Sequence, residues 1–109
     1  MSEQPGDAGG LTLGALQRQI RRMYGVKDEA RGDAATFLWL TEEFGELATA
    51  LRSGTRDELA AEMADVLAWL ATLANIRGID LEEAVLRKYG RACPGCRSVP
   101  CACDPAEKP

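Results

Sequence analysis

Two apolar stripes of helical period, placed symmetrically about Gly54, constrain the fold of this chain more than any other feature. The stripes cover residues 37–51 and 59–73, with apolar residues three or four positions apart in each. The segment Ser53-Gly54-Thr55-Arg56 interrupts the pattern between them. If two such helices fold back as an antiparallel hairpin, residues equidistant from Gly54 lie opposite each other. Because no strand pattern occurs, the sequence predicts an all-α antiparallel bundle of about four helices.

This register brings four carboxylates together. Glu43 and Glu46 share one face of the first helix, because residues three positions apart are neighbours on a helix surface, and Glu62 and Asp65 share one face of the second. Glu46 then lies opposite Glu62 and Glu43 opposite Asp65, with no Lys or Arg at these positions. At an effective dielectric constant of ~20, each like-charge contact at ~4 Å would cost about 4 kcal/mol. The cluster therefore requires protons or cations to offset its charge.

Carboxylate ligands without His or Cys favour Mg²⁺ or Mn²⁺ over zinc, because these hard cations prefer oxygen ligands. The competing interpretation is that each acidic pair lies on the solvated face of a surface helix, as most glutamate-rich stretches do. The register match between the two pairs favours a shared metal site.

Length and composition exclude several classes of function. The net charge of −4 and the lack of a basic run disfavour binding to a nucleic-acid polymer. No apolar run approaches the ~20 residues that span a bilayer, and residues 1–10 lack the features of a signal peptide, so we expect a cytoplasmic protein without a membrane partner. The absence of His excludes Ser-His and Cys-His catalysis and the Glu-x-x-His ligands of a di-iron bundle.

A chain of 109 residues has room for one domain, which we place at residues 11–90 between a disordered leader (1–10) and a cysteine-rich tail (91–109). Four short helices bury little core, so we expect a homodimer or homotetramer. Caps and glycines set the expected helix boundaries. We expect a first helix from Leu11 to Tyr24, a polar loop from Gly25 to Gly32, and a second helix with Asp33 as its N-cap. A Thr55–Glu58 capping box opens the third helix, which stops at Gly78, and an Asp80–Glu83 capping box opens a fourth helix that ends near Tyr89.

Both tryptophans obey the same register. Trp39 precedes Glu43 by one turn and Trp69 follows Asp65 by one turn, so both indoles should border the same end of the acidic cluster. Large apolar faces beside a metal suit a ligand with phosphates at one end and a flat base at the other. The alternative is that the two indoles pack a helix interface.

The acidic motif resembles the signature of the MazG-like nucleoside triphosphate pyrophosphohydrolases, Glu-Glu-x-x-Glu followed by Glu-x-x-Asp. It stands here as Glu42-Glu43-Phe44-Gly45-Glu46 and Glu62-Met63-Ala64-Asp65, and the likeness extends over about residues 11–89. The resemblance implies an all-α oligomer that hydrolyses a nucleoside triphosphate to the monophosphate and pyrophosphate. It also implies that Glu43, Glu46, Glu62 and Asp65 bind magnesium.

Other residues receive roles from this comparison. Glu42 is not needed as a ligand, but it lies one turn from Glu46 and can orient the attacking water or support the metal ligands. Lys88 and Arg91 are the best matches to the polar residues that meet phosphates in the family, although Tyr89 stands where an amide is expected. Asn75 is assigned either to substrate binding or to the end of its helix.

All four cysteines fall within eleven residues, as Cys93, Cys96, Cys101 and Cys103. Cys-x-x-Cys is a common half of a zinc site, and Pro94-Gly95 supplies the tight turn that it needs, so the first interpretation is a structural zinc knuckle. Disulfides would require an oxidising compartment, and a thioredoxin-like redox centre would require a βαβ setting that is absent.

The leading hypothesis is thus a magnesium-dependent nucleotide pyrophosphohydrolase that clears unwanted or non-canonical nucleotides. Its rival is a non-catalytic helical module that dimerises and binds a partner through its cysteine tail.

Overall fold

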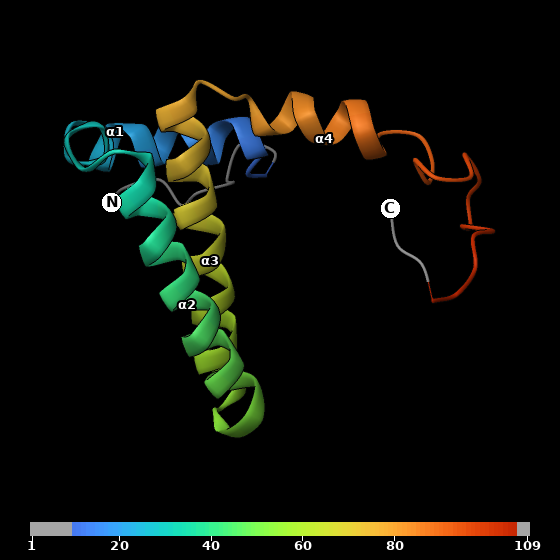
Figure 1. Cartoon of the computed structure of the whole chain (residues 1–109), viewed down its shortest axis with the longest axis horizontal. Helices are drawn as coiled ribbons and strands as arrows, with labels where there is room; N and C mark the ends of the chain where they lie inside the picture. The colour runs from blue at the N-terminus through green and yellow to red at the C-terminus, as the bar shows by residue number, and fades with distance from the viewer. Residues whose placement is uncertain (1–9, 107–109) are drawn as a thin grey trace.

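The computed structural model describes residues 10–106 and shows, over that range, four helices and no strand: α1 (Leu13–Arg31), α2 (Asp33–Ser53), α3 (Arg56–Arg77) and α4 (Leu81–Tyr89). Helices α2 and α3 form a long antiparallel hairpin that projects from the rest of the chain (Figure 1). Helix α1 crosses the base of this hairpin, and α4 leads away from it toward the cysteine tail. The all-α prediction is confirmed, and the predicted leader lies almost wholly outside the described residues.

The turn between α2 and α3 is set by residues at both helix ends. The Thr55 hydroxyl accepts a hydrogen bond from the backbone N–H of Glu58 at 3.1 Å, and the Glu58 carboxylate accepts one from the N–H of Thr55 at 2.8 Å. This reciprocal capping box is confirmed, and it supplies two helix-end N–H groups with acceptors. A Cβ atom at Gly54 would lie 2.9 Å from the backbone of Ala50, so only glycine fits this turn.

The first helix is longer than predicted. The expected loop at residues 25–32 is wrong, because α1 continues through it to Arg31. Asp28 and Arg31 form an ion pair of 3.0 Å across one turn, and this contact helps to offset the cost of about 1 kcal/mol for a glycine inside the helix at Gly25. The helix ends at Gly32, whose φ of 84° is a conformation that favours glycine.

The cap predicted at Asp33 is also wrong. Gly32 occupies the N-cap position of α2, and Asp33 is the first residue of the helix. Its carboxylate instead pairs with Arg77 at 2.7 Å, which ties the start of α2 to the end of α3 and lowers the pKa of Asp33. Helix α3 ends at Gly78 in the left-handed conformation, as expected. At α4 the Asp80 side chain accepts from the N–H of Glu83, which confirms that cap.

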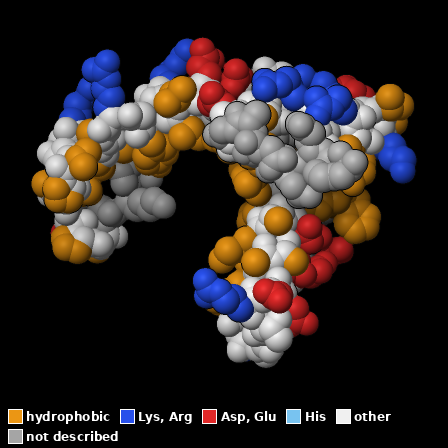
Figure 2. Space-filling model, turned by 180° about the vertical axis from the view of Figure 1, so that it is seen from behind, with side chains coloured by type: hydrophobic (Ala, Val, Ile, Leu, Met, Phe, Trp, Pro, Cys, Tyr) orange, Lys and Arg blue, Asp and Glu red, His pale blue; other side chains and the backbone are white. Residues whose placement is uncertain are grey.

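Few side chains in the described part of the chain are buried. Among the described residues, the buried apolar ones are Ile20, Leu40, Ala50, Ala71 and Ala74. Figure 2 shows acidic side chains along one side of the projecting hairpin and hydrophobic side chains exposed elsewhere on it. The hairpin therefore carries much of its apolar surface uncovered.

Helix α3 is long and apolar enough to cross a membrane by length and composition alone. The sequence expectation concerned uninterrupted apolar runs, and the apolar stretch of this helix is interrupted by Glu62 and Asp65. Core helices of soluble proteins can be equally long and apolar. Here α3 packs against both α2 and α1.

Candidate active site

The register of the hairpin places the candidate site halfway along it. Trp39 of α2 and Trp69 of α3 stack with ring centroids 6.2 Å apart and planes inclined by 12°. These residues are equidistant from Gly54, so their contact confirms the antiparallel register predicted from the sequence. The same register carries the acidic residues of the two helices toward each other.

Three of the four predicted carboxylate ligands converge. Glu43, Glu46 and Glu62 each offer one oxygen, and these oxygens all lie within 4.8 Å of one another. Asp65 is not part of this group, although it is close enough for its charge to act on Glu43. One oxygen of Glu43 and one of Glu62, both named Oε1, are buried without a hydrogen-bond partner among the described residues.

The environment of Glu43 favours its neutral form when no cation is present. Burial, followed by the charge of Glu46 and by interactions with Glu62 and Asp65, raises the pKa of Glu43 to about 7. Desolvation and like charges both disfavour a carboxylate, so the shift has two causes that a bound cation would reverse.

Glu42 lies on the wall of a cleft of about 490 Å³ beside this cluster. The cleft is shared with Glu46 and Glu62 and extends toward the turn, where Thr49 and Gly54 line it. The fifth acidic residue of the motif is thus exposed to the same solvent-filled space as two of the candidate ligands.

These residues fit a hard divalent cation. The donors are carboxylate oxygens, two of which are buried and lack any other partner, and no cationic side chain is hydrogen-bonded to them in the described part of the chain. Such a set matches the preference of Mg²⁺ or Mn²⁺ for oxygen and lacks the nitrogen and sulfur that zinc prefers.

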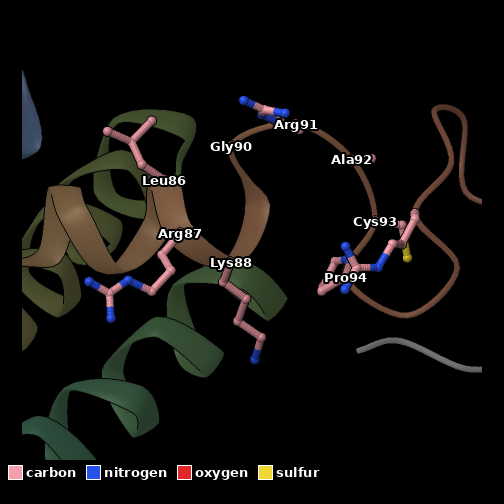
Figure 3. Close-up of a pocket in the computed structure, with 9 residues that line it drawn as sticks. Leu86, Arg87, Lys88, Gly90, Arg91, Ala92, Cys93 and Pro94 are labelled. Atoms are coloured by element: carbon pink, nitrogen blue, oxygen red, sulfur yellow. The ribbon is translucent and has the colours of Figure 1, made fainter.

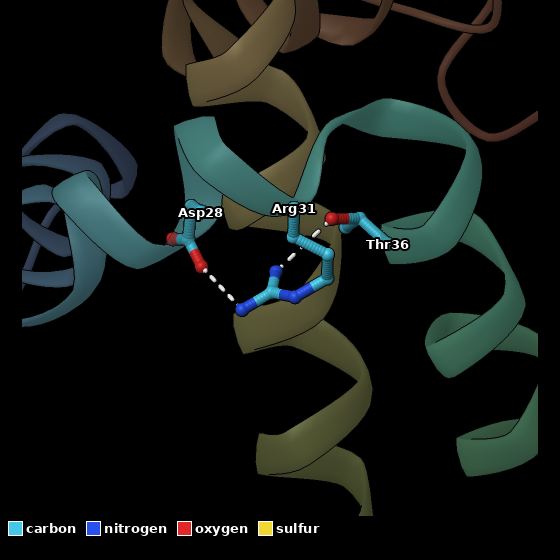
Figure 4. A network of polar contacts seen from close by, with 3 residues as sticks. All are labelled: Asp28, Arg31 and Thr36. Carbon is cyan, nitrogen blue, oxygen red and sulfur yellow. Dashed lines mark hydrogen bonds and ion pairs between the residues drawn. The ribbon is translucent and has the colours of Figure 1, made fainter.

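An arginine that the sequence analysis did not single out contacts the tryptophan pair. The guanidinium carbon of Arg31 lies 5.0 Å from the ring centroid of Trp69. Arg31 also pairs with the buried Asp28 and donates to the hydroxyl of the buried Thr36 at 3.0 Å (Figure 4). A loop at residues 25–32, as the sequence predicts, gives no reason to pair Asp28 with Arg31, whereas the helix places them one turn apart.

Asn75 lies between α3 and α1, and its side chain is engaged there. Its Oδ1 accepts hydrogen bonds from Gln17 and Arg21 at 3.0 and 3.1 Å, and its Nδ2 donates to the carbonyl of Gln17 at 3.0 Å. These contacts give Asn75 a packing role, and its role in substrate binding stays a prediction.

Gln17 connects three helices, a role that no sequence motif indicates. Its amide nitrogen donates to Asn75 and to the carbonyl of Ile79, and its amide oxygen accepts from the N–H of Leu81 at 2.7 Å. The buried Gln17 thereby fixes the bases of α3 and α4 to α1. A single glutamine in an apolar stripe gives no sequence signal for such long-range contacts.

Lys88 and Arg91 belong to a different cleft, of about 790 Å³, between the end of α4 and the cysteine tail (Figure 3). Arg87 and Arg97 also line it, and among the described residues no carboxylate does. None of the acidic motif residues contributes to this cleft, so a single chain does not bring the predicted phosphate-binding residues to the acidic cluster.

The four cysteines form a second compact cluster. Each of Cys93, Cys96, Cys101 and Cys103 offers a sulfur, and the four sulfurs lie within 4.8 Å of one another. All four are free thiols in this structure.

Comparison with known proteins identifies one family. The family model described as the MazG nucleotide pyrophosphohydrolase domain matches residues 31–97, more than half of the chain. This range contains both halves of the acidic motif and the first two cysteines. No curated protein matches the chain.

Proposed function

This chain belongs to the MazG nucleotide pyrophosphohydrolase domain family, and on that premise we propose that it hydrolyses a nucleoside or deoxynucleoside triphosphate to the monophosphate and pyrophosphate with the help of Mg²⁺. The observation that carries the proposal is the convergence of Glu43, Glu46 and Glu62 with two buried oxygens that lack a partner. A cluster of this kind is unfavourable in a metal-free protein and becomes favourable when it binds a cation.

Glu43, Glu46 and Glu62 would hold the metal, with Asp65 beside them. A bound Mg²⁺ supplies charge to offset that of the phosphate oxygens and lowers the pKa of a water ligand. The carboxylates fix the place at which the triphosphate binds, since they attract the cation that accompanies it.

Glu42 is the residue that we assign to the attacking water. It lines the same cleft as Glu46 and Glu62, and it is not needed as a ligand. A carboxylate in that position would accept a hydrogen bond from water and take up its proton as the water oxygen bonds to the α-phosphorus and pyrophosphate leaves.

The exposed indole of Trp39 is the surface that we assign to the nucleobase. Its side chain is 48% exposed and lies one helical turn from Glu43. Trp69 is contacted by both Trp39 and Arg31, and these contacts help to hold the Trp39 indole in place. Stacking on an aromatic ring accommodates any base, which suits an enzyme that acts on non-canonical nucleotides.

We further propose that the protein is a homodimer or homotetramer. The hairpin exposes large apolar residues on both helices, which a monomer would leave in water. They include Phe37, Leu38, Phe44, Leu51, Met63, Leu67 and Leu70. A sedimentation mass equal to one chain at micromolar concentration would refute this assembly.

The decisive experiment is a screen of canonical and modified nucleotides with Mg²⁺ that measures pyrophosphate and monophosphate separately. We expect equal amounts of the two products, and we expect Glu46→Gln and Asp65→Asn each to abolish their release. Glu29→Gln, an exposed change on α1, serves as the matched control and should retain activity. Retained activity in Asp65→Asn would contradict the mechanism, and inactivity with every nucleotide would favour the non-catalytic helical module.

A further inference from the structure

The cysteine tail follows α4 as an irregular segment with little apolar surface to pack. Its one large aliphatic side chain, Val99, is 76% exposed. Two backbone hydrogen bonds form its first turn, from the N–H of Arg97 to the carbonyl of Cys93 at 2.7 Å and from the N–H of Cys93 to the carbonyl of Ser98 at 3.2 Å. So few contacts do not offset the entropy of ordering eleven residues, because fixing each residue costs about 1–2 kcal/mol. Something other than a hydrophobic core must hold this segment.

The sulfur atoms have the spacing of a tetrahedral metal site. Those of Cys93 and Cys103 are 3.8 Å apart, and those of Cys96 and Cys101 are 3.9 Å apart. Four thiolates around one zinc ion at ~2.3 Å place neighbouring sulfurs about 3.8 Å apart. A disulfide would bring two sulfurs to about 2.05 Å and leave the pairs separate, whereas here all four gather around one point.

The surrounding backbone donates hydrogen bonds to these sulfurs. The N–H groups of Gly95, Ala102 and Cys103 donate to Cys93, Cys96 and Cys101 at 3.3, 3.1 and 3.3 Å. Such bonds favour the thiolate, which is the form that binds a metal.

The adjoining cleft offsets the charge of such a site. A divalent cation with four thiolates has a net charge of −2, and the cleft beside Cys93 is lined by Arg87, Lys88, Arg91 and Arg97 (Figure 3). Cationic side chains in this position would offset the charge of the anionic centre.

We propose that Cys93, Cys96, Cys101 and Cys103 bind one Zn²⁺ as a closed structural site that folds residues 93–103 onto the end of α4. Four protein ligands leave no open position for water, so this zinc takes no part in hydrolysis. Its role is to fix one wall of the basic cleft. Without the metal, Arg91 and Arg97 belong to a segment that few other contacts hold in place.

The test uses the full chain, purified under reducing conditions without added metal. We expect about one zinc per chain, four thiols that resist alkylation, and release of all four thiols when a strong chelator removes the zinc. Addition of Co²⁺ to the metal-free chain should give the intense absorption bands of tetrahedral cobalt-thiolate coordination, with saturation at one equivalent. The readouts are independent of hydrolysis, so the zinc site can fail while the proposed enzyme stands.

Two variants locate the metal. Cys93→Ser combined with Cys96→Ser should lose the zinc and the cobalt bands while keeping the helical circular dichroism. Asp65→Asn should keep the zinc and the cobalt bands. Val99→Ser is the matched control within the tail, and it should bind zinc as the parent does. Zinc-free reduced protein, disulfides in place of thiols, or zinc retained by the double serine variant would overturn the proposal. Iron in the purified protein in place of zinc would overturn the metal assignment.

Discussion

The two ligand clusters of this chain, carboxylates on the hairpin and thiols in the tail, differ in what holds them together. The carboxylates sit on two long helices whose backbone hydrogen bonds and tryptophan stack fix their positions without any metal. The thiols sit on an irregular segment held by a few backbone bonds and by the sulfurs themselves. A cation at the first cluster would relieve repulsion in a structure that already exists, whereas a cation at the second would supply most of the free energy that forms the structure.

The sharpest test of this comparison changes one cluster and measures both. We expect Glu62→Gln to reduce kcat/KM for the best nucleotide at least about 100-fold, because it removes a metal ligand whose charge acts in the transition state. The zinc content of the same variant should equal that of the parent, because no residue is shared between the two clusters. Zinc lost from Glu62→Gln would show that the clusters are not independent.

The second test compares stability with and without magnesium. Glu46→Gln should leave the metal-free hairpin as stable as the parent or more stable, because the change keeps the side-chain shape and removes repulsion. Magnesium at about 100 times its dissociation constant should add about 2.7 kcal/mol to the parent by mass action and much less to the variant. Thermal unfolding of both proteins in chelator and in Mg²⁺ measures this difference. A melting temperature in chelator that is lower for Glu46→Gln than for the parent would contradict the expectation that carboxylate repulsion destabilises the metal-free hairpin.

The third test is the pH dependence of the metal-free hairpin. The pKa of Glu43 is raised from 4.5 to about 7 by burial and by neighbouring carboxylates. Between these values the folded chain keeps a proton that the unfolded chain has lost, so the free energy of unfolding falls as pH rises through this window and levels off above it.

Thermal unfolding in chelator should therefore show a melting temperature that decreases from pH 5 to pH 7, and Glu43→Gln should flatten the curve. Magnesium should flatten it as well, because the cation favours the charged carboxylate. Asp33 does not obscure the measurement, since its pKa is lowered by Arg77 and its effect falls at more acidic pH. An equal slope in Glu43→Gln would contradict this account.

The smallest expected effect is optical. If the base stacks on Trp39, a nucleotide with Mg²⁺ should quench part of the tryptophan emission, and Trp39→Phe should remove most of the change. Trp69→Phe should alter it less, because Trp69 already contacts Trp39 and Arg31. Zinc removal should leave the emission unchanged, since the cysteine cluster shares no residue with the indole pair. Quenching that survives in Trp39→Phe would exclude this residue as the base platform.

The hairpin could be predicted from the sequence because its information is local. The apolar period defines the two helices, Gly54 and the Thr55–Glu58 capping box define the turn, and these together place Trp39 opposite Trp69. The convergence of Glu43, Glu46 and Glu62 then follows from spacing alone. Asp65 lies outside this group, although its negative charge raises the pKa of Glu43.

The contacts of α1 could not be predicted in the same way. Gln17 and Arg31 act on residues far along the chain, Asn75 and Trp69, and the sequence contains no pattern that pairs them. The extension of α1 beyond Tyr24 depends on such packing, which overrides the weak signals of Gly25 and the charged residues after it. A preference for one nucleotide would depend on side chains around the candidate site, and helix period and capping signals give no information on these.

The turn at Gly54 has a consequence for how this chain tolerates a change of length. Each facing pair is defined by equal distance from this residue, so one residue added to the first turn of α3 would advance the rest of that helix by ~1.5 Å and rotate it by about 100° relative to α2. The indole stack and the carboxylate cluster would both lose their partners at once, although none of their residues had been replaced. A substitution along the hairpin changes the contacts of one residue, whereas a change of length at this end of α3 acts on the stack and the cluster simultaneously.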